Sequence, residues 1–141
     1  MAQPLLQVKN LKKYFQAGKP GLFSRSEQFV HAVDGIDLQL RRGEVIALVG
    51  ESGCGKSTLS LTLMGLEEAT EGTILFNGRD ITHLTEKERK SVRQRIQMVF
   101  QDPYESLNPT QTIEEIVMEP LIVHGIAHNA GERNNLVSRA L

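Results

Sequence analysis

Hydrophobic and polar positions alternate in short runs over the first forty residues. Residues 5–14 place apolar side chains at Leu6, Val8 and Leu11, with Asn10 interrupting the pattern. Residues 29–33 and 36–40 read as two further strands, the second alternating strictly between apolar and polar positions. A period of two is typical of strands with one buried face. The beginning of the chain therefore predicts a succession of strands.

A different pattern begins at residue 45. Residues 45–49 form one continuous apolar run, which predicts a strand buried on both faces. Leu59, Leu63 and Leu66 then recur at helical spacing, and Gly65 offers a stop. The pattern predicts a strand, a glycine-rich turn and a helix in succession.

Local signals divide the next thirty residues. A short apolar strand over 72–76 ends in Asn77-Gly78, which favours a type I′ hairpin. Thr85 and Glu88 have the spacing of a capping box and predict a charged helix through about residue 92. Residues 95–100 read as the next strand.

The pattern of residues changes after Gln101. Residues 102–109 form a loop with two prolines, and an apolar stripe over 113–121 then predicts a helix that Pro120 should kink or split. Gly125 should end it, and another helix should begin at residue 129 or 130. We predict two parts, 1–101 and 102–141: a core with a β-subdomain, and the start of a helical subdomain.

The turn after residue 49 carries the strongest chemical signal. It reads Gly50-Glu51-Ser52-Gly53-Cys54-Gly55-Lys56-Ser57-Thr58 and matches G-x-x-x-x-G-K-[ST], the phosphate-binding P-loop. The predicted strand before it and helix after it are the context that this motif requires. All nine residues are candidates for nucleotide binding.

Each residue type suits a polyphosphate. Glycines allow positive φ and close approach of the backbone, so the amides of 53–58 can surround the β-phosphate at the positive end of a helix. Lys56 is expected on the β- and γ-phosphates, Ser57 on Mg²⁺ and Thr58 at the α-phosphate. Cys54 serves there as a small residue.

Composition narrows the function classes. The 141 residues have a formal net charge of −1, which gives no electrostatic signature of nucleic-acid binding. The single cysteine excludes an internal disulfide and fits a reducing compartment. We find neither a signal-peptide pattern nor an apolar run of the roughly 18 residues that a membrane span requires. The four histidines form no ligand cluster by spacing and are interpreted as surface or packing residues.

Taken together, these motifs resemble the ATP-binding subunits of ABC transporters, and most closely the oligopeptide and dipeptide importer branch. The matching stretches are 8–15, 31–36, the P-loop, and 97–109 with its F-Q-D-P-x-x-S-L-N-P pattern; the loop at 21–25 is also similar. The resemblance runs from near residue 5 to near residue 125. It implies an α/β P-loop NTPase fold with an amino-terminal antiparallel β-subdomain and the start of a helical subdomain.

The resemblance also assigns roles. Tyr14 matches the aromatic residue that stacks on adenine, although a strand aromatic packed in the core is the simpler alternative. Gln101 matches the Q-loop glutamine that reaches Mg²⁺ and the attacking water, whereas glutamines at strand ends are usually only polar caps. Lys56 and Gln101 are thus the catalytic candidates, and the cofactors are ATP and Mg²⁺.

Partners and location follow from the resemblance alone. It implies transmembrane permease subunits contacted through 102–109, a second ABC ATPase subunit, and indirectly a solute-binding protein. It implies a cytoplasmic protein, peripheral on the inner face of the membrane. Peptide, nickel and glutathione importers have similar ATPase subunits, so the solute stays open.

Several parts of an ABC ATPase are not found in the sequence. We find no Leu-Ser-Gly-Gly-Gln signature, no Walker B strand ending in Asp-Glu, and no switch histidine after such a strand. We therefore expect an amino-terminal fragment that is marginally stable and inactive as an ATPase by itself. The strands beside the P-loop strand would come from elsewhere in the parent protein.

Two other functions remain open. A soluble P-loop protein, such as a nucleotide-dependent switch, would act without a permease, although the Asn-Lys-x-Asp motif of GTPases is not found. An inactive remnant would bind no nucleotide. Co-purification with a permease tests the first alternative, and nucleotide binding compared with Lys56→Ala tests the second.

Overall fold

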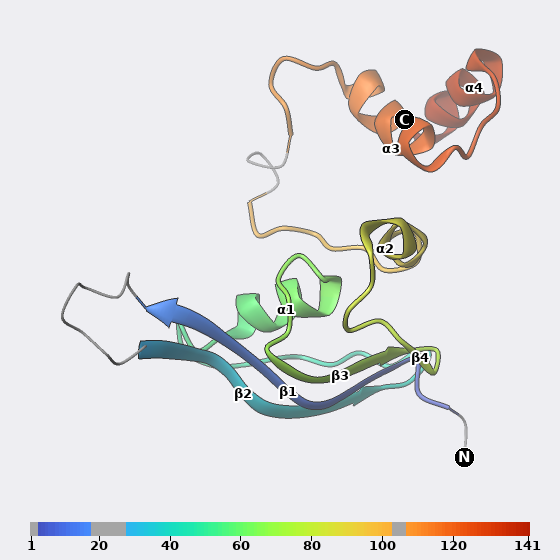
Figure 1. The fold of residues 1–141 in the computed structure, drawn as a ribbon. Helices are drawn as coiled ribbons and strands as arrows, with labels where there is room; N and C mark the ends of the chain where they lie inside the picture. The colour runs from blue at the N-terminus through green and yellow to red at the C-terminus, as the bar shows by residue number, and fades with distance from the viewer. Residues whose placement is uncertain (1–2, 18–27, 103–106) are drawn as a thin grey trace. The chain divides into compact units, whose positions relative to one another are not determined.

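A computed structural model describes residues 3–17, 28–102 and 107–141, in two compact units, Met1–Ser91 and Val92–Leu141 (Figure 1). The predicted loop at 21–25 and residues 103–106 of the proline-rich loop lie outside the described residues. The predicted division after residue 101 stays a prediction. The described residues contain no helix long and apolar enough to cross a bilayer.

The first unit is built on an antiparallel sheet. Its strands are β1 (Leu6–Ala17), β2 (Gln28–Leu40), β3 (Glu71–Phe76) and β4 (Arg79–Asp80), in the order β2-β1-β3-β4. The two strands predicted over 29–40 are a single strand, which passes through Gly35 at a φ of 70°. The predicted amino-terminal antiparallel strands are confirmed.

One face of this sheet is covered by helix α1 (Lys56–Met64), as Figure 1 shows. Val8 and Leu11 of β1 and Val33 of β2 are buried, and Leu59 and Thr62 are buried on α1. Gly65 ends the helix with a left-handed conformation and donates its amide to the carbonyl of Thr62, as predicted. The core of the first unit therefore lies between β1, β2 and α1.

Two local predictions in this unit are confirmed. Asn77 and Gly78 join β3 to β4 with φ values of 49° and 76°, the two positive angles of a type I′ turn. Helix α2 (Glu86–Arg93) begins with a capping box, in which the Glu88 amide donates to Thr85 Oγ1 at 3.4 Å and the Thr85 amide donates to Glu88 Oε2 at 3.1 Å.

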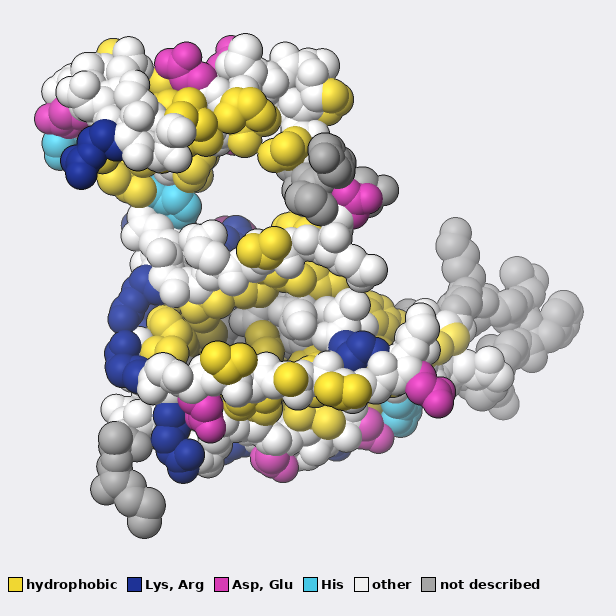
Figure 2. Space-filling view, turned by 180° about the vertical axis from the view of Figure 1, so that it is seen from behind, with side chains coloured by type: hydrophobic (Ala, Val, Ile, Leu, Met, Phe, Trp, Pro, Cys, Tyr) yellow, Lys and Arg dark blue, Asp and Glu magenta, His cyan; other side chains and the backbone are white. Residues whose placement is uncertain are grey.

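The predicted strands over 45–49 and 95–100 are not strands. Val45 and Val49 are 93% and 90% exposed, and Val99 is 91% exposed. Figure 2 shows hydrophobic side chains gathered on the face of the first unit turned toward the viewer. An apolar run becomes a buried strand only when neighbouring strands take up its backbone hydrogen bonds, and in the described residues none pairs with these segments.

The second unit contains helices α3 (Ile113–His124) and α4 (Ala130–Ala140). Helix α3 starts with a capping box between Thr112 and Glu115, which we did not predict, and Gly125 ends it, as predicted. It runs through Pro120 without a break, so Pro120 does not split the helix, and the alternative of a kink there stays a prediction. The core of this unit is small: Ala127 and Val137 are its buried apolar side chains among the described residues.

Candidate nucleotide-binding site

The P-loop leads directly into α1. Gly53 and Gly55 have φ values of 81° and 94°, in the region that favours glycine. Gly55 is the N-cap residue of α1, and no side chain caps this end of the helix. The first amides of α1 therefore point out of the helix at its positive end, an arrangement that suits an anion.

The Lys56 side chain folds back over the loop. Its ammonium donates to the carbonyl oxygens of Gly50 at 2.7 Å and Glu51 at 2.6 Å, and lies 3.3 Å from Cys54 Sγ. These three contacts draw the loop around one positive charge. A polyphosphate in the loop would meet this charge together with the α1 amides.

Other predicted P-loop residues lie at the start of the helix or on the loop surface. Ser57 is exposed in the first turn of α1, and Thr58 is half-buried beside it. Glu51, Ser52 and Cys54 are exposed. The loop and first turn thus bring all nine motif residues together around the amino terminus of α1, where glycines, an ammonium and hydroxyl groups fit a magnesium-bound triphosphate.

Tyr14 takes part in a different network. Its hydroxyl donates to Asp34 Oδ1 at 2.5 Å, and its ring stacks on His31 with centroids 3.9 Å apart. The hydrogen bond raises the pKa of Tyr14 and lowers the pKa of Asp34, since the carboxylate is stabilised as an acceptor. Lys12, the neighbour two positions before Tyr14, pairs with Glu71 at 2.7 Å.

This network lies on the sheet face away from α1. Residues 11, 13 and 15 alternate with 12, 14 and 16 along β1. Leu11 is fully buried in the core, and Lys13 pairs in register with the buried Val33. Tyr14 therefore projects to the other side, and the structure does not bring its ring together with the P-loop.

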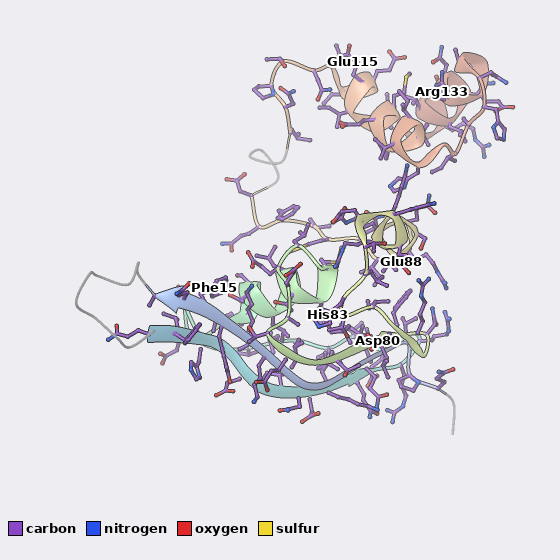
Figure 3. The ribbon with its side chains drawn as sticks, in the orientation of Figure 1. Phe15, Asp80, His83, Glu88, Glu115 and Arg133 are labelled. Carbon is purple, nitrogen blue, oxygen red and sulfur yellow. The ribbon has the colours of Figure 1, made fainter. Side chains whose placement is uncertain are left out.

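Phe15, which is not among the predicted site residues, is the neighbour of Tyr14 on β1. It follows Lys13 on the α1 side of the sheet and is 37% exposed; Figure 3 labels it near the end of β1. Counting the period of two from Leu11 rather than from Leu6 would have placed Phe15 on this side of the sheet, because Asn10, at a φ of 45°, breaks the alternation between Leu6 and Leu11.

Gln101 belongs to the second unit and is exposed. Its predicted contact with Mg²⁺ stays a prediction. Residues 103–106 of the predicted permease contact at 102–109 lie outside the described residues, and Leu107, which is described, is 41% exposed.

Comparison with known proteins decides the family. The family model described as ABC transporter matches residues 33–140. The chain belongs to the ABC transporter family. This match includes the P-loop, the first unit from Val33 onward and the second unit up to Ala140, and it confirms the resemblance seen in the sequence.

Relatives of this chain are named as transport or import ATP-binding proteins. The oligopeptide transport ATP-binding protein AppF of Bacillus subtilis is 48% identical over 99% of this chain and 42% of its own length. The glutathione import ATP-binding protein GsiA of Salmonella typhimurium is 46% identical over 88% of this chain and 20% of its own length. The dipeptide transport ATP-binding protein DppF of Escherichia coli is 44% identical over 88% of this chain and 36% of its own length. The chain thus spans about two fifths or less of these relatives.

Solved ABC cassettes have the same fold. The ATP-binding cassette MJ0796, in a dimeric post-hydrolysis state bound to ADP and Pi, matches 95% of this chain with a TM-score of 0.75 and 27% identity. The protein cbiO1 of Clostridium perfringens, part of the transporter complex cbiONQ, matches 99% with a TM-score of 0.71 and 28% identity. The chain covers 54% and 50% of those two chains. The predicted fold class is confirmed.

Proposed function

We propose that this chain binds ATP with Mg²⁺ through its P-loop, as the ATP-binding part of an ABC importer subunit. The observation that carries the proposal is the geometry at the start of α1. There, Gly55 is an N-cap without a side-chain cap, and the Lys56 ammonium lies against the carbonyl oxygens of the loop. Backbone amides and one positive charge converge where a triphosphate would lie.

The residues have separate roles in this proposal. The amides of 53–58 bind the β-phosphate, Lys56 neutralises charge on the β- and γ-phosphates, and the Ser57 hydroxyl is a ligand for Mg²⁺. Thr58 contacts the α-phosphate. Mg²⁺, when bound, neutralises phosphate charge during hydrolysis. By the family resemblance, Gln101 would reach Mg²⁺ and the attacking water.

The proposed physiological role is energising solute uptake. The names of AppF, GsiA and DppF support a peptide or a related solute such as glutathione. In this role the chain would sit at the cytoplasmic face of the membrane. It would contact permease subunits through 102–109, pair with a second ATPase subunit, and serve a solute-binding protein indirectly. Co-purification with a permease supports this role, and a nucleotide-binding chain that never associates with one favours a soluble P-loop protein.

Calorimetric titration with MgATP tests nucleotide binding. Lys56→Ala should weaken binding by about tenfold or more, because hydrogen bonds to charged groups contribute roughly 1.5–3 kcal/mol. Lys87→Ala removes the same charge from the exposed surface of α2 and should leave affinity unchanged. Equal affinities in the chain and both variants would refute the proposed phosphate site. Absence of binding in the unaltered chain would favour an inactive remnant.

A further inference from the structure

The P-loop touches the sheet at one place on β2. A side chain on Gly55 would overlap the carbonyl oxygen of Ala32, and its first carbon would lie 3.9 Å from Val33 Cγ2. Gly55 is also the N-cap residue of α1, with a φ of 94°. The position of the Ala32 carbonyl group therefore limits where α1 begins and where its first amides point.

Ala32 lies in a β-bulge. Lys13 on β1 is opposite Val33 on β2. The next residue of β1, Tyr14, is opposite His31, two positions before Val33. Ala32 is therefore an extra residue on β2, and a bulge of this kind bends its strand and disrupts the ladder of hydrogen bonds locally. Bulges can redirect the groups around them, and here the carbonyl group at the bulge meets the P-loop.

Three side chains hold the two sides of this bulge, on the sheet face away from α1. The Tyr14 ring stacks on His31 with centroids 3.9 Å apart, and the Tyr14 hydroxyl donates to Asp34 Oδ1 at 2.5 Å. His31 Nδ1 lies 3.5 Å from Asp34 Oδ2. In a regular strand, residues three positions apart face opposite sides. His31 and Asp34 meet because the bulge between them turns both side chains to the side of Tyr14.

Asp34 is the charged centre of this cluster. The hydrogen bond from Tyr14 holds its pKa below the ordinary value, and His31 and Lys12 act in the same direction, so the carboxylate is ionised at neutral pH. Lys12 is itself paired with Glu71 of β3 at 2.7 Å. The side chains of His31 and Asp34 are 53% and 56% exposed, so the contacts of the cluster should have modest effects on binding.

We propose that Tyr14, His31 and Asp34 position the P-loop from the opposite side of the sheet, by fixing the bulge whose Ala32 carbonyl group contacts Gly55. The inference rests on the proposed triphosphate site in the P-loop. The three residues act through the backbone of Ala32 and the start of α1 rather than by touching phosphate. Once the cluster is broken, that backbone can shift, and the first amides of α1 lose part of their alignment on the anion.

The resonance of the Gly55 amide tests the positioning role without a ligand. Asp34→Asn removes the charge, and Tyr14→Phe removes the hydroxyl but keeps the stacked ring. Both should shift the Gly55 signal in a proton–nitrogen correlation spectrum of the full chain. Asp37→Asn is the matched control, because Asp37 also joins β2 to β1, by accepting from the Asn10 amide at 3.1 Å. It should leave the Gly55 signal in place, and an unmoved signal in both cluster variants would overturn the inference.

The affinity of the full chain for magnesium tripolyphosphate, measured by calorimetry, tests the consequence for binding. This ligand has no base, so a change in base stacking cannot alter its affinity. Asp34→Asn and Tyr14→Phe should each lower the affinity by about two- to fivefold, the effect of losing one exposed charged contact. Because both changes remove the same hydrogen bond, the double variant should lose less than the product of the two single effects. Asp37→Asn should bind like the unaltered chain.

Two results would contradict the role of the cluster. In the first, both cluster variants bind tripolyphosphate as well as the unaltered chain does, while Lys56→Ala binds it more weakly; the proposed function then stands without the inference. In the second, the double variant loses the full product, which would show that Tyr14 and Asp34 act separately. Failure of the proposed function has a different signature. The unaltered chain would then bind no tripolyphosphate, while a Gly55 signal that still moves in the cluster variants would support the positioning of the loop.

Discussion

The carbonyl oxygen of Ala32 on β2 occupies the space in which a side chain on Gly55 would begin. Gly55 also has a φ of 94°, a conformation that other residues rarely adopt. A single glycine therefore joins the P-loop to the sheet and starts α1. The phosphate loop depends on β2 for its shape as well as on its own motif.

Gly55→Ala should destabilise the chain by about 3 kcal/mol or more, because it adds a backbone clash to the cost of positive φ. Gly43→Ala is the matched control: its φ is 75°, but no atom lies within 4 Å of the added carbon. It should cost only about 1–2 kcal/mol. Urea unfolding measures both, and equal losses would show that Ala32 does not constrain the loop.

Gly65 and Arg89 should be energetically coupled. A side chain on Gly65 would overlap the guanidinium of Arg89, which is 8% exposed and donates to the Leu84 carbonyl at 3.2 Å. Gly65→Ala should therefore lower the free energy of unfolding more than Gly125→Ala does. Gly125 has the same left-handed conformation as Gly65, but a side chain there would enter open space. In a double-mutant cycle with Arg89→Ala, the stability lost by the double variant should be smaller than the sum of the losses in the two single variants, by about 0.5 kcal/mol or more. Strict additivity would contradict this packing.

Asp80 should make stability depend on acid pH. Its Oδ1 accepts hydrogen bonds from Thr82 Oγ1 at 2.6 Å and from the Thr82 amide at 2.9 Å, which hold its pKa below the ordinary value. Thr82 Oγ1 in turn accepts from the amide of Ile74 on β3 at 2.8 Å.

Because the folded pKa is the lower one, this stabilisation is fully present above the ordinary pKa near 3.8 and is lost as pH falls through the folded value. As the pH is lowered from 6, the free energy of unfolding should fall less in Asp80→Asn than in the unaltered chain. A steeper loss in the variant would contradict the assignment. Glu119→Gln, an exposed carboxylate on α3, is the control.

The apolar segment at 45–49 should contribute little to the stability of this chain. Val45 is 93% exposed, whereas Leu11 is fully buried. Leu11→Ala should cost about 2–5 kcal/mol, and Val45→Ala should lie within about 0.5 kcal/mol of the unaltered chain. A large loss for Val45→Ala would mean that this segment is buried in solution. Exposed runs of this kind also predict marginal stability and self-association, which sedimentation can measure.

Local chemistry was predictable from the sequence because each signal depends on residues close together in the chain. The P-loop glycines, the Asn77-Gly78 turn and the capping box at Thr85 are of this kind. The turn and the capping box are complete within their motifs, whereas the phosphate loop also depends on Ala32 of β2. Features that depend on residues far apart in the chain could not be predicted in this way. The run at 45–49 reads as a buried strand, but strand formation depends on partners that are not adjacent in sequence.

The direction of a side chain on β1 also depends on distant residues. The pairing between β1 and β2 shifts in register between Lys13 and Tyr14, and a shift of one residue reverses the face. The pairing of Lys13 with Val33 and its contact with Glu67 determine which side of the sheet Lys13 faces, and neither partner is close to it in the sequence.

The most direct test of the phosphate site is a crystal structure of the chain with a non-hydrolysable ATP analogue and Mg²⁺. We predict phosphate density inside the loop, within hydrogen-bond distance of the amides of 53–58. The Lys56 ammonium should have turned from the Gly50 and Glu51 carbonyl oxygens toward the β- and γ-phosphates. Analogue density elsewhere, with Lys56 still bound to those carbonyl oxygens, would contradict the site.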